Sequence, residues 1–142
     1  MRRAHRSLPL WALLLALGAP AAGQESGDAD GRSTGEGVYS AAQAERGKKA
    51  FDAYCTNCHS AGQFAGGTFL KNWSGSTVGM VYDFLSGSMP QDAPGSLKPQ
   101  EYADILAFFL KQNGFPAGSS ELPSSSRALA AIRIESPAAG GR

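Results

Sequence analysis

The feature that most constrains this chain is the run Cys55-Thr56-Asn57-Cys58-His59, which has the spacing C-x-x-C-H. Two thiols three positions apart on one helical turn face the same way, so both can form thioethers with the two vinyl groups of one porphyrin. The adjacent histidine then lies under the iron. The run therefore predicts that Cys55 and Cys58 attach a c-type haem covalently and that His59 is its proximal ligand.

Other chemistry also uses two cysteines at this spacing. A closed zinc site needs four ligands, and besides the run itself the chain offers only His5, which lies in a segment expected to be removed. A thioredoxin-like pair should follow a strand within a βαβ pattern, and no such strand is expected before Cys55. A thiol–disulfide oxidoreductase and a plain structural disulfide remain as the alternatives.

Residues 1–23 have the pattern of a secretory signal peptide. Three arginines precede an apolar run from Leu8 to Leu17, and a small-residue cleavage region ends at Gly23. The apolar run is short for a membrane span, and an uncleaved anchor is the alternative. We therefore expect export to the periplasm, where an oxidising environment suits covalent haem attachment, with no stable membrane insertion once the signal is removed.

Removal of this segment changes the charge balance. The segment carries three of the 13 lysines and arginines and none of the 12 acidic residues, which leaves ten basic against 12 acidic side chains. A mildly acidic surface argues against nucleic acid as a partner, because binding to phosphates needs clustered positive charge. Docking to another protein through a small patch remains open.

The chain after the signal begins with a segment that lacks large apolar side chains. Residues 24–37 are rich in glycine, serine and acidic residues, which predicts a flexible leader. Ser40 and Gln43 then have capping-box spacing at the start of a helix over residues 41–55. Glycine inside a helix costs about 1 kcal/mol relative to alanine, so Gly47 predicts the close approach of another helix.

The middle of the chain predicts a loop, a short helix and a second loop. Residues 60–67 lack periodicity and read as the loop after the haem-binding turn. The short helix should be capped by Ser74 or Ser76 and should end at Gly87. Two prolines and a terminal glycine predict that residues 88–95 form the second loop.

The strongest helix pattern follows this second loop. Pro99 stands at its first position, apolar residues recur at i, i+3, i+4, i+7 and i+8 from Tyr102, and Asn113-Gly114 closes it. The serine-rich tail over residues 117–142 is expected to be partly ordered. Its residues 127–134 have enough apolar content for a turn of helix or a short strand, and its last six residues are expected to fray.

A haem that carries electrons usually has its sixth iron position filled, and a thioether ligand raises the potential. The chain has three methionines, of which Met1 lies in the signal. Met80 falls within the short helix, where core packing is its ordinary role. Met89 lies in the proline-bounded loop, where it can reach the far face of the porphyrin without breaking a helix. We therefore expect Met89 to be the distal ligand, with Met80 or an open site as alternatives.

A helix leading into C-x-x-C-H, a Met-Pro loop and a C-terminal amphipathic helix together resemble a class I cytochrome c. The resemblance covers about Tyr39 to Pro116 and implies an all-α fold, with about four short helices around one covalent haem c in a domain over residues 38–116. Residues 89–97 and 101–118 look similar to small bacterial cytochrome domains that accompany exported dehydrogenases, including quinoprotein ones.

The resemblance implies thioether links at Cys55 and Cys58 and iron ligation by His59 and Met89. It also places Gly47 where the first and last helices of the family cross. The chain departs from the family after the motif. Ser60 stands where a glycine often follows, and no proline whose carbonyl could orient the proximal imidazole occurs between Ser60 and Leu70. The resemblance thus implies four cofactor-binding residues, Cys55, Cys58, His59 and Met89, of which His59 and Met89 are the metal ligands.

The function that follows is transfer of single electrons, without enzymatic chemistry, between a donor dehydrogenase and an acceptor such as an oxidase or another cytochrome. Two alternatives are a thiol–disulfide oxidoreductase that uses Cys55 and Cys58, and a haem sensor or peroxidase with an open sixth site. Six aromatic residues are candidates for the walls of the haem pocket: Phe51, Phe64, Phe69, Trp73, Phe84 and Phe109.

Overall fold

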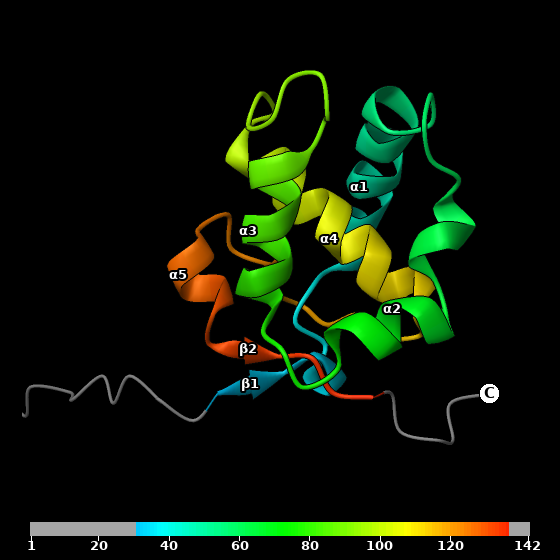
Figure 1. Cartoon of the computed structure of the whole chain (residues 1–142). Coiled ribbons are helices and arrows are strands. Elements are labelled where there is room, and N and C mark those ends of the chain that lie inside the picture. Colours follow the sequence, from blue (N-terminus) through cyan, green and yellow to red (C-terminus); the bar gives the residue numbers. More distant parts are fainter. Residues whose placement is uncertain (1–30, 137–142) are drawn as a thin grey trace, which may run out of the picture.

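The computed structural model describes residues 31–136 and is mostly helical (Figure 1). The expected all-α class is confirmed, with a short fifth α-helix beyond the four that were expected. None of the described helices is long and apolar enough to cross a membrane. In chain order the elements are β1 (Arg32–Ser33), the 3-10 helix η1 (Thr34–Glu36), α1 (Ala41–Tyr54), the 3-10 helix η2 (Ala61–Phe64), α2 (Gly67–Trp73), α3 (Val78–Ser88), α4 (Pro99–Gln112), α5 (Ser126–Leu129) and β2 (Ile132–Arg133).

The contact between α1 and α4 is the most extensive between any two described elements. Gly47 of α1 is buried at the point where the backbone of α4 passes at Asp104, which confirms the close approach expected there. Every residue from Tyr102 to Leu110 is buried, so α4 is covered on all sides rather than on one face. Figure 1 shows why, since α1, α3 and the C-terminal segment over residues 117–136 surround this helix.

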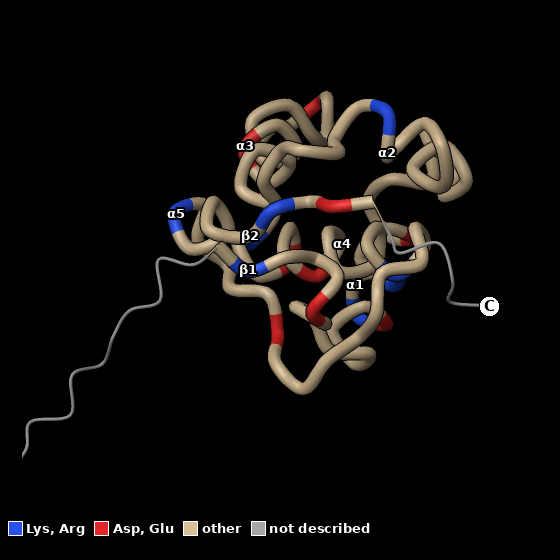
Figure 2. The backbone as a smooth tube through the Cα atoms, turned by 90° about the horizontal axis from the view of Figure 1, so that it is seen from below, with Lys and Arg blue, Asp and Glu red and all other residues tan. Residues whose placement is uncertain are grey.

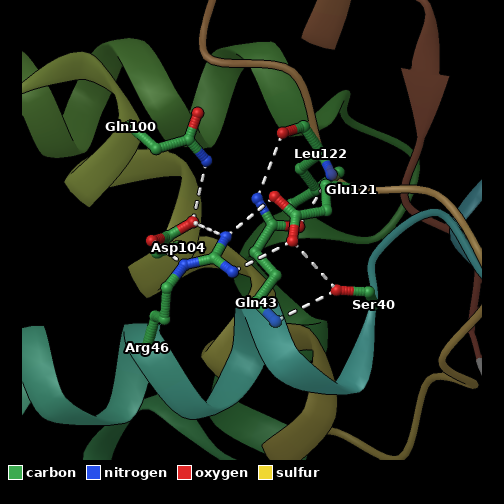
Figure 3. Close-up of polar contacts among 7 residues, drawn as sticks. All are labelled: Ser40, Gln43, Arg46, Gln100, Asp104, Glu121 and Leu122. Atoms are coloured by element: carbon green, nitrogen blue, oxygen red, sulfur yellow. Dashed lines mark hydrogen bonds and ion pairs between the residues drawn. The ribbon is translucent and has the colours of Figure 1, made fainter.

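A cluster of polar side chains ties α1, α4 and the C-terminal segment together (Figure 3). The guanidinium of Arg46 donates to both carboxylate oxygens of Asp104, at 3.0 and 3.1 Å, and also to Glu121. Beside it, the buried side-chain amide of Gln43 donates to the carbonyl of Leu122 at 3.1 Å and accepts from the backbone N–H of Leu122 at 2.7 Å. The C-terminal segment is therefore held to α1 by side chain and main chain.

The start of α3 differs from the expectation. Thr77, rather than Ser74 or Ser76, is the N-cap, and its hydroxyl accepts from the backbone N–H of Met80 at 3.3 Å. Ser74 instead ends α2, which the sequence did not predict as a helix. The far end differs too, because α3 continues through Gly87 to Ser88. A glycine ends a helix only where the backbone turns left-handed, and Gly87 keeps the helical conformation.

The flexible leader expected over residues 24–37 is corrected for its described part, residues 31–37. There, β1 pairs in parallel with β2, and Arg32 lies opposite Ile132. Thr34 is fully buried, and the Ser33 hydroxyl donates to Glu135 at 2.7 Å. The strand forms because a partner about a hundred positions later supplies its hydrogen bonds, which no local pattern could indicate. The remaining residues of the leader, 24–30, and the signal segment 1–23 lie outside the described residues.

The C-terminal segment returns across the domain and packs on it. Leu122, Leu129, Ile132 and Ile134 are each 2 % exposed or less. Residues 127–134 include both a turn of helix and a strand, as the apolar content indicated. Figure 2 shows lysine, arginine, aspartate and glutamate positions interspersed over the described chain. The expected fraying of residues 137–142 concerns residues outside the described range.

Candidate functional site

The C-x-x-C-H run forms a turn that continues from the end of α1. The hydroxyl of Ser40 caps the start of this helix by accepting from Gln43 N–H at 3.0 Å. At its end, Cys55 N–H donates to the carbonyl of Phe51, and the Cys55 carbonyl then accepts from Cys58 and His59 at 3.2 and 2.9 Å. This continuous backbone bonding presents the two thiols and the imidazole together at one end of α1.

These side chains line a cavity of about 820 Å³ between the end of α1, the end of α3, the loop that follows it and α4. The volume lies in the range of about 300–1,000 Å³ that is usual for cofactor pockets. The lining is predominantly apolar: Phe51, Tyr54, Cys55, Asn57, Cys58, His59, Phe64, Phe84, Leu85, Met89, Pro90, Gln91, Asp92 and Phe109.

The cavity distinguishes between the two methionines outside the signal segment. Met89 lines it, while Met80 is 56 % exposed on α3 and is not part of the lining. The position of Met89 is defined by its main chain, because its carbonyl accepts the hydroxyl of Tyr102 at 2.7 Å and its N–H donates to Leu85 at 2.9 Å. The four residues expected from sequence, Cys55, Cys58, His59 and Met89, therefore meet at one cavity.

Residues 42–109 match the family model described as "Cytochrome C oxidase, cbb3-type, subunit III". The matched span contains α1, the C-x-x-C-H run, the Met-Pro loop and most of α4. This match supports a class I c-type cytochrome domain in this part of the chain. No significant match was found among curated proteins or among solved structures.

A cytochrome domain of this class implies covalently bound haem c and acts as a haem-based electron carrier with redox partners. The described residues fit that cofactor. Two thiols at the required spacing, an imidazole and a thioether all border one apolar cavity. This donor set is the one used by cytochromes that carry electrons, in which His and Met ligation raises the potential.

The walls of this cavity include four of the six aromatic residues expected to line a haem pocket. Phe51, Phe64, Phe84 and Phe109 line it, and the rings of Phe64 and Phe109 stack at 4.7 Å. The other two lie elsewhere: Phe69 is buried in the core, and the half-buried Trp73 packs on Phe84 at 5.7 Å. Both belong to α2, which contributes no residue to this lining.

The thiols of the C-x-x-C-H run can be compared with those of a thiol–disulfide oxidoreductase. Burial raises the pKa of the Cys55 thiol above its ordinary value. Cysteines that perform thiol–disulfide exchange need the opposite shift, because the thiolate is the nucleophile. The surroundings of Cys55 therefore argue against a redox-active thiol at this position.

Sequence reasoning missed one residue of the site, Gln63. Its side-chain oxygen lies 3.3 Å from Nδ1 of His59. Gln63 belongs to the 3-10 helix η2, which lies within the loop expected over residues 60–67. The spacing of four positions after the histidine was the available signal, because such residues lie on the same side of a helical turn.

Proposed function

We propose that this chain is an exported monohaem cytochrome c that carries single electrons in the periplasm. The donor is a dehydrogenase, and the acceptor is an oxidase or another cytochrome. One observation carries the proposal: the thiols of Cys55 and Cys58, the imidazole of His59 and the thioether of Met89 border a single apolar cavity. The secretory pattern at the start of the chain supports the periplasmic location.

The four residues would have separate roles. Cys55 and Cys58 hold the haem through thioethers, and His59 and Met89 supply the two iron ligands. The bound group contributes an iron that changes valence. The protein contributes a rigid donor set, in which the carbonyl of Met89 is held by Tyr102, and aromatic walls that exclude water. If His59 and Met89 both stayed bound in the two valence states, little would have to reorganise on electron transfer.

The mouth of the cavity supports transfer to protein partners. Cys58 is exposed, and Phe84, which lines the cavity, is 58 % exposed. Tyr54, at 44 % exposure, adds a further apolar ring to this rim. Exposed apolar side chains beside the covalent attachment site suit a small, transient contact of the kind that redox proteins form.

The intact mass of the chain tests the proposal directly. The chain is expressed with its first 23 residues in a bacterium that attaches haem in its periplasm, and the exported form is weighed. The expected mass is that of residues 24–142 plus one haem, and the pigment should survive acid–acetone extraction. A Cys55→Ser, Cys58→Ser double variant should be colourless. An exported wild-type chain with the mass of the bare polypeptide would contradict the proposal.

A second measurement addresses the partners. The haem-bearing chain is mixed with periplasmic dehydrogenases and oxidases from an organism that encodes it, and its reduction and oxidation are followed by absorbance. Reduction by a dehydrogenase and oxidation by an oxidase or cytochrome are expected. Turnover of peroxide by the chain alone would instead favour the peroxidase alternative.

A further inference from the structure

The imidazole of His59 has a partner that comes from the residues immediately after the haem motif. Gln63 Oε1 lies 3.3 Å from His59 Nδ1 and also accepts the backbone N–H of Ser60 at 3.2 Å. Gln63 is the hydrogen-bond partner found for this ring among residues 31–136. The contact to Ser60 matters because it holds the amide oxygen beside the ring, although the Gln63 side chain is exposed.

The turn that carries Gln63 is anchored at its other end. The backbone N–H of Gln63 donates to the carbonyl of Ser60 at 3.1 Å, which closes the first turn of η2. The next residue, Phe64, stacks on Phe109 of α4, and its carbonyl accepts the side-chain amide of the buried Asn113 at 2.8 Å. The turn is therefore fixed between the haem motif and the end of α4.

We propose that Gln63 is a positioning residue for the proximal ligand, a role that rests on the proposed function. Its side-chain carbonyl accepts the Nδ1–H of His59, which fixes the tautomer and leaves Nε2 free for the iron. Between Ser60 and Leu70 the chain has no proline whose backbone carbonyl could do this. A side chain thus takes over an orienting contact that could otherwise come from the main chain.

The hydrogen bond should also tune the iron. An acceptor on Nδ1–H makes the imidazole a stronger donor, and a stronger donor favours the oxidised iron. The hydrogen bond is present in both valence states, so only the difference in its strength between them changes the redox equilibrium, by a factor of up to about 10. Its removal should raise the ratio of reduced to oxidised protein by that factor at a fixed solution potential.

Two variants of Gln63 test the role on the haem-bearing chain. Gln63→Leu removes the acceptor, and the ratio of reduced to oxidised protein should rise by a factor of up to about 10. Exchange of the His59 Nδ1 proton with solvent, followed by NMR in the reduced state, should become faster. Gln63→Glu retains an acceptor and strengthens it, so the ratio should fall and the exchange should not become faster.

The charge introduced by glutamate needs its own control. Gly62→Glu places the same charge one residue earlier on η2, where an added Cβ meets no atom within 4 Å. Its effect on the ratio should be smaller than that of Gln63→Glu. An unchanged ratio and exchange rate in Gln63→Leu would overturn the inference, and so would an equal effect of the two glutamates. If Gln63→Leu fails to mature, the comparison of the two glutamates decides.

The failure of this inference is distinguishable from failure of the proposed function. A wild-type chain without haem, shown by its mass, would overturn both. A wild-type chain that carries haem, together with Gln63 variants that behave like it, would overturn only the role of Gln63.

Discussion

The carbonyl oxygen of Asp104 occupies the space that a side chain at Gly47 would need, because a Cβ added to Gly47 would clash with that oxygen. This contact sets how closely α1 and α4 can cross. The crossing in turn sets the positions of Phe51 and Phe109, whose rings are 5.8 Å apart and both line the cavity. The haem motif follows directly on α1, so its place depends on the same contact.

Replacement of Gly47 by alanine should therefore destabilise the fold. The new methyl group meets backbone atoms, which cannot move aside as a side chain would, so the free energy of unfolding should fall by about 3 kcal/mol or more. Gly87→Ala is the matched control, since Gly87 is also helical and nothing lies within 4 Å of its added Cβ. The control should be neutral or stabilising by up to about 1 kcal/mol in denaturant unfolding. Similar losses in both variants would contradict the crossing described here.

Met89→Ala should change the spectrum and the potential of the haem-bearing chain, whereas Met80→Ala should not. Loss of Met89 removes the thioether at the cavity, so the thioether-to-iron absorption band of the oxidised protein should disappear and the potential should fall. Met80 is 56 % exposed and outside the cavity lining, so its loss should leave both unchanged. Absorption spectra and potentiometric titration check this. A band that survives in Met89→Ala would favour Met80 as the ligand, and a wild-type spectrum without the band would favour the sensor or peroxidase alternative.

Gln43→Met should loosen the C-terminal segment. Gln43 is fully buried, and the nitrogen and the oxygen of its side-chain amide both bond the main chain of Leu122. Methionine is of similar size but leaves the N–H and the carbonyl of Leu122 without their partner. The expected loss is about 2–4 kcal/mol in the free energy of unfolding. Limited proteolysis should cut first within residues 117–136. Gln112→Met, at a partly exposed position, should change neither result.

The ion pairs of Arg46 should make stability depend on pH. The hydrogen bond from Arg46 holds the pKa of Glu121 below its ordinary value of 4.5. A carboxylate with a depressed pKa in the folded state contributes its full stabilisation above the unfolded pKa and loses it as the pH falls through the folded value. In Arg46→Met the loss of stability relative to wild type should thus be largest near neutral pH and should shrink below about pH 4.5.

Denaturant midpoints at about pH 7 and about pH 3 measure this difference. At neutral pH the loss should be about 1–3 kcal/mol, because Arg46 also bonds both oxygens of the buried Asp104. Lys48→Met is the control. It breaks an exposed pair with Asp52 four residues along the same helix, and such a pair contributes only about 0.3–0.5 kcal/mol. An Arg46→Met effect that does not vary with pH would contradict the argument.

Much of the fold and of the candidate site followed from local patterns. The Ser40 cap and the helix from Pro99 depend on neighbours within about one or two turns, and the structure agrees with both. The proline-bounded loop favoured Met89 over Met80 as the ligand, and Met89 lines the cavity. The cap of α3 was misassigned because Ser74, Ser76 and Thr77 are chemically equivalent caps. Only the packing of α2 before them decides which one adopts the extended backbone.

The sequence by itself determined the chemistry of this protein: a C-x-x-C-H run, a methionine in a proline-bounded loop, and a glycine where two helices cross. These are properties of residue type and short spacing, which the chain carries whether folded or not. Only the tertiary structure decided that residues 32–33 pair with residues 132–133 and that the C-terminal segment is held to α1 by Gln43. Such contacts depend on the path of the whole backbone, because the free energy that favours them appears only once distant segments have been brought together.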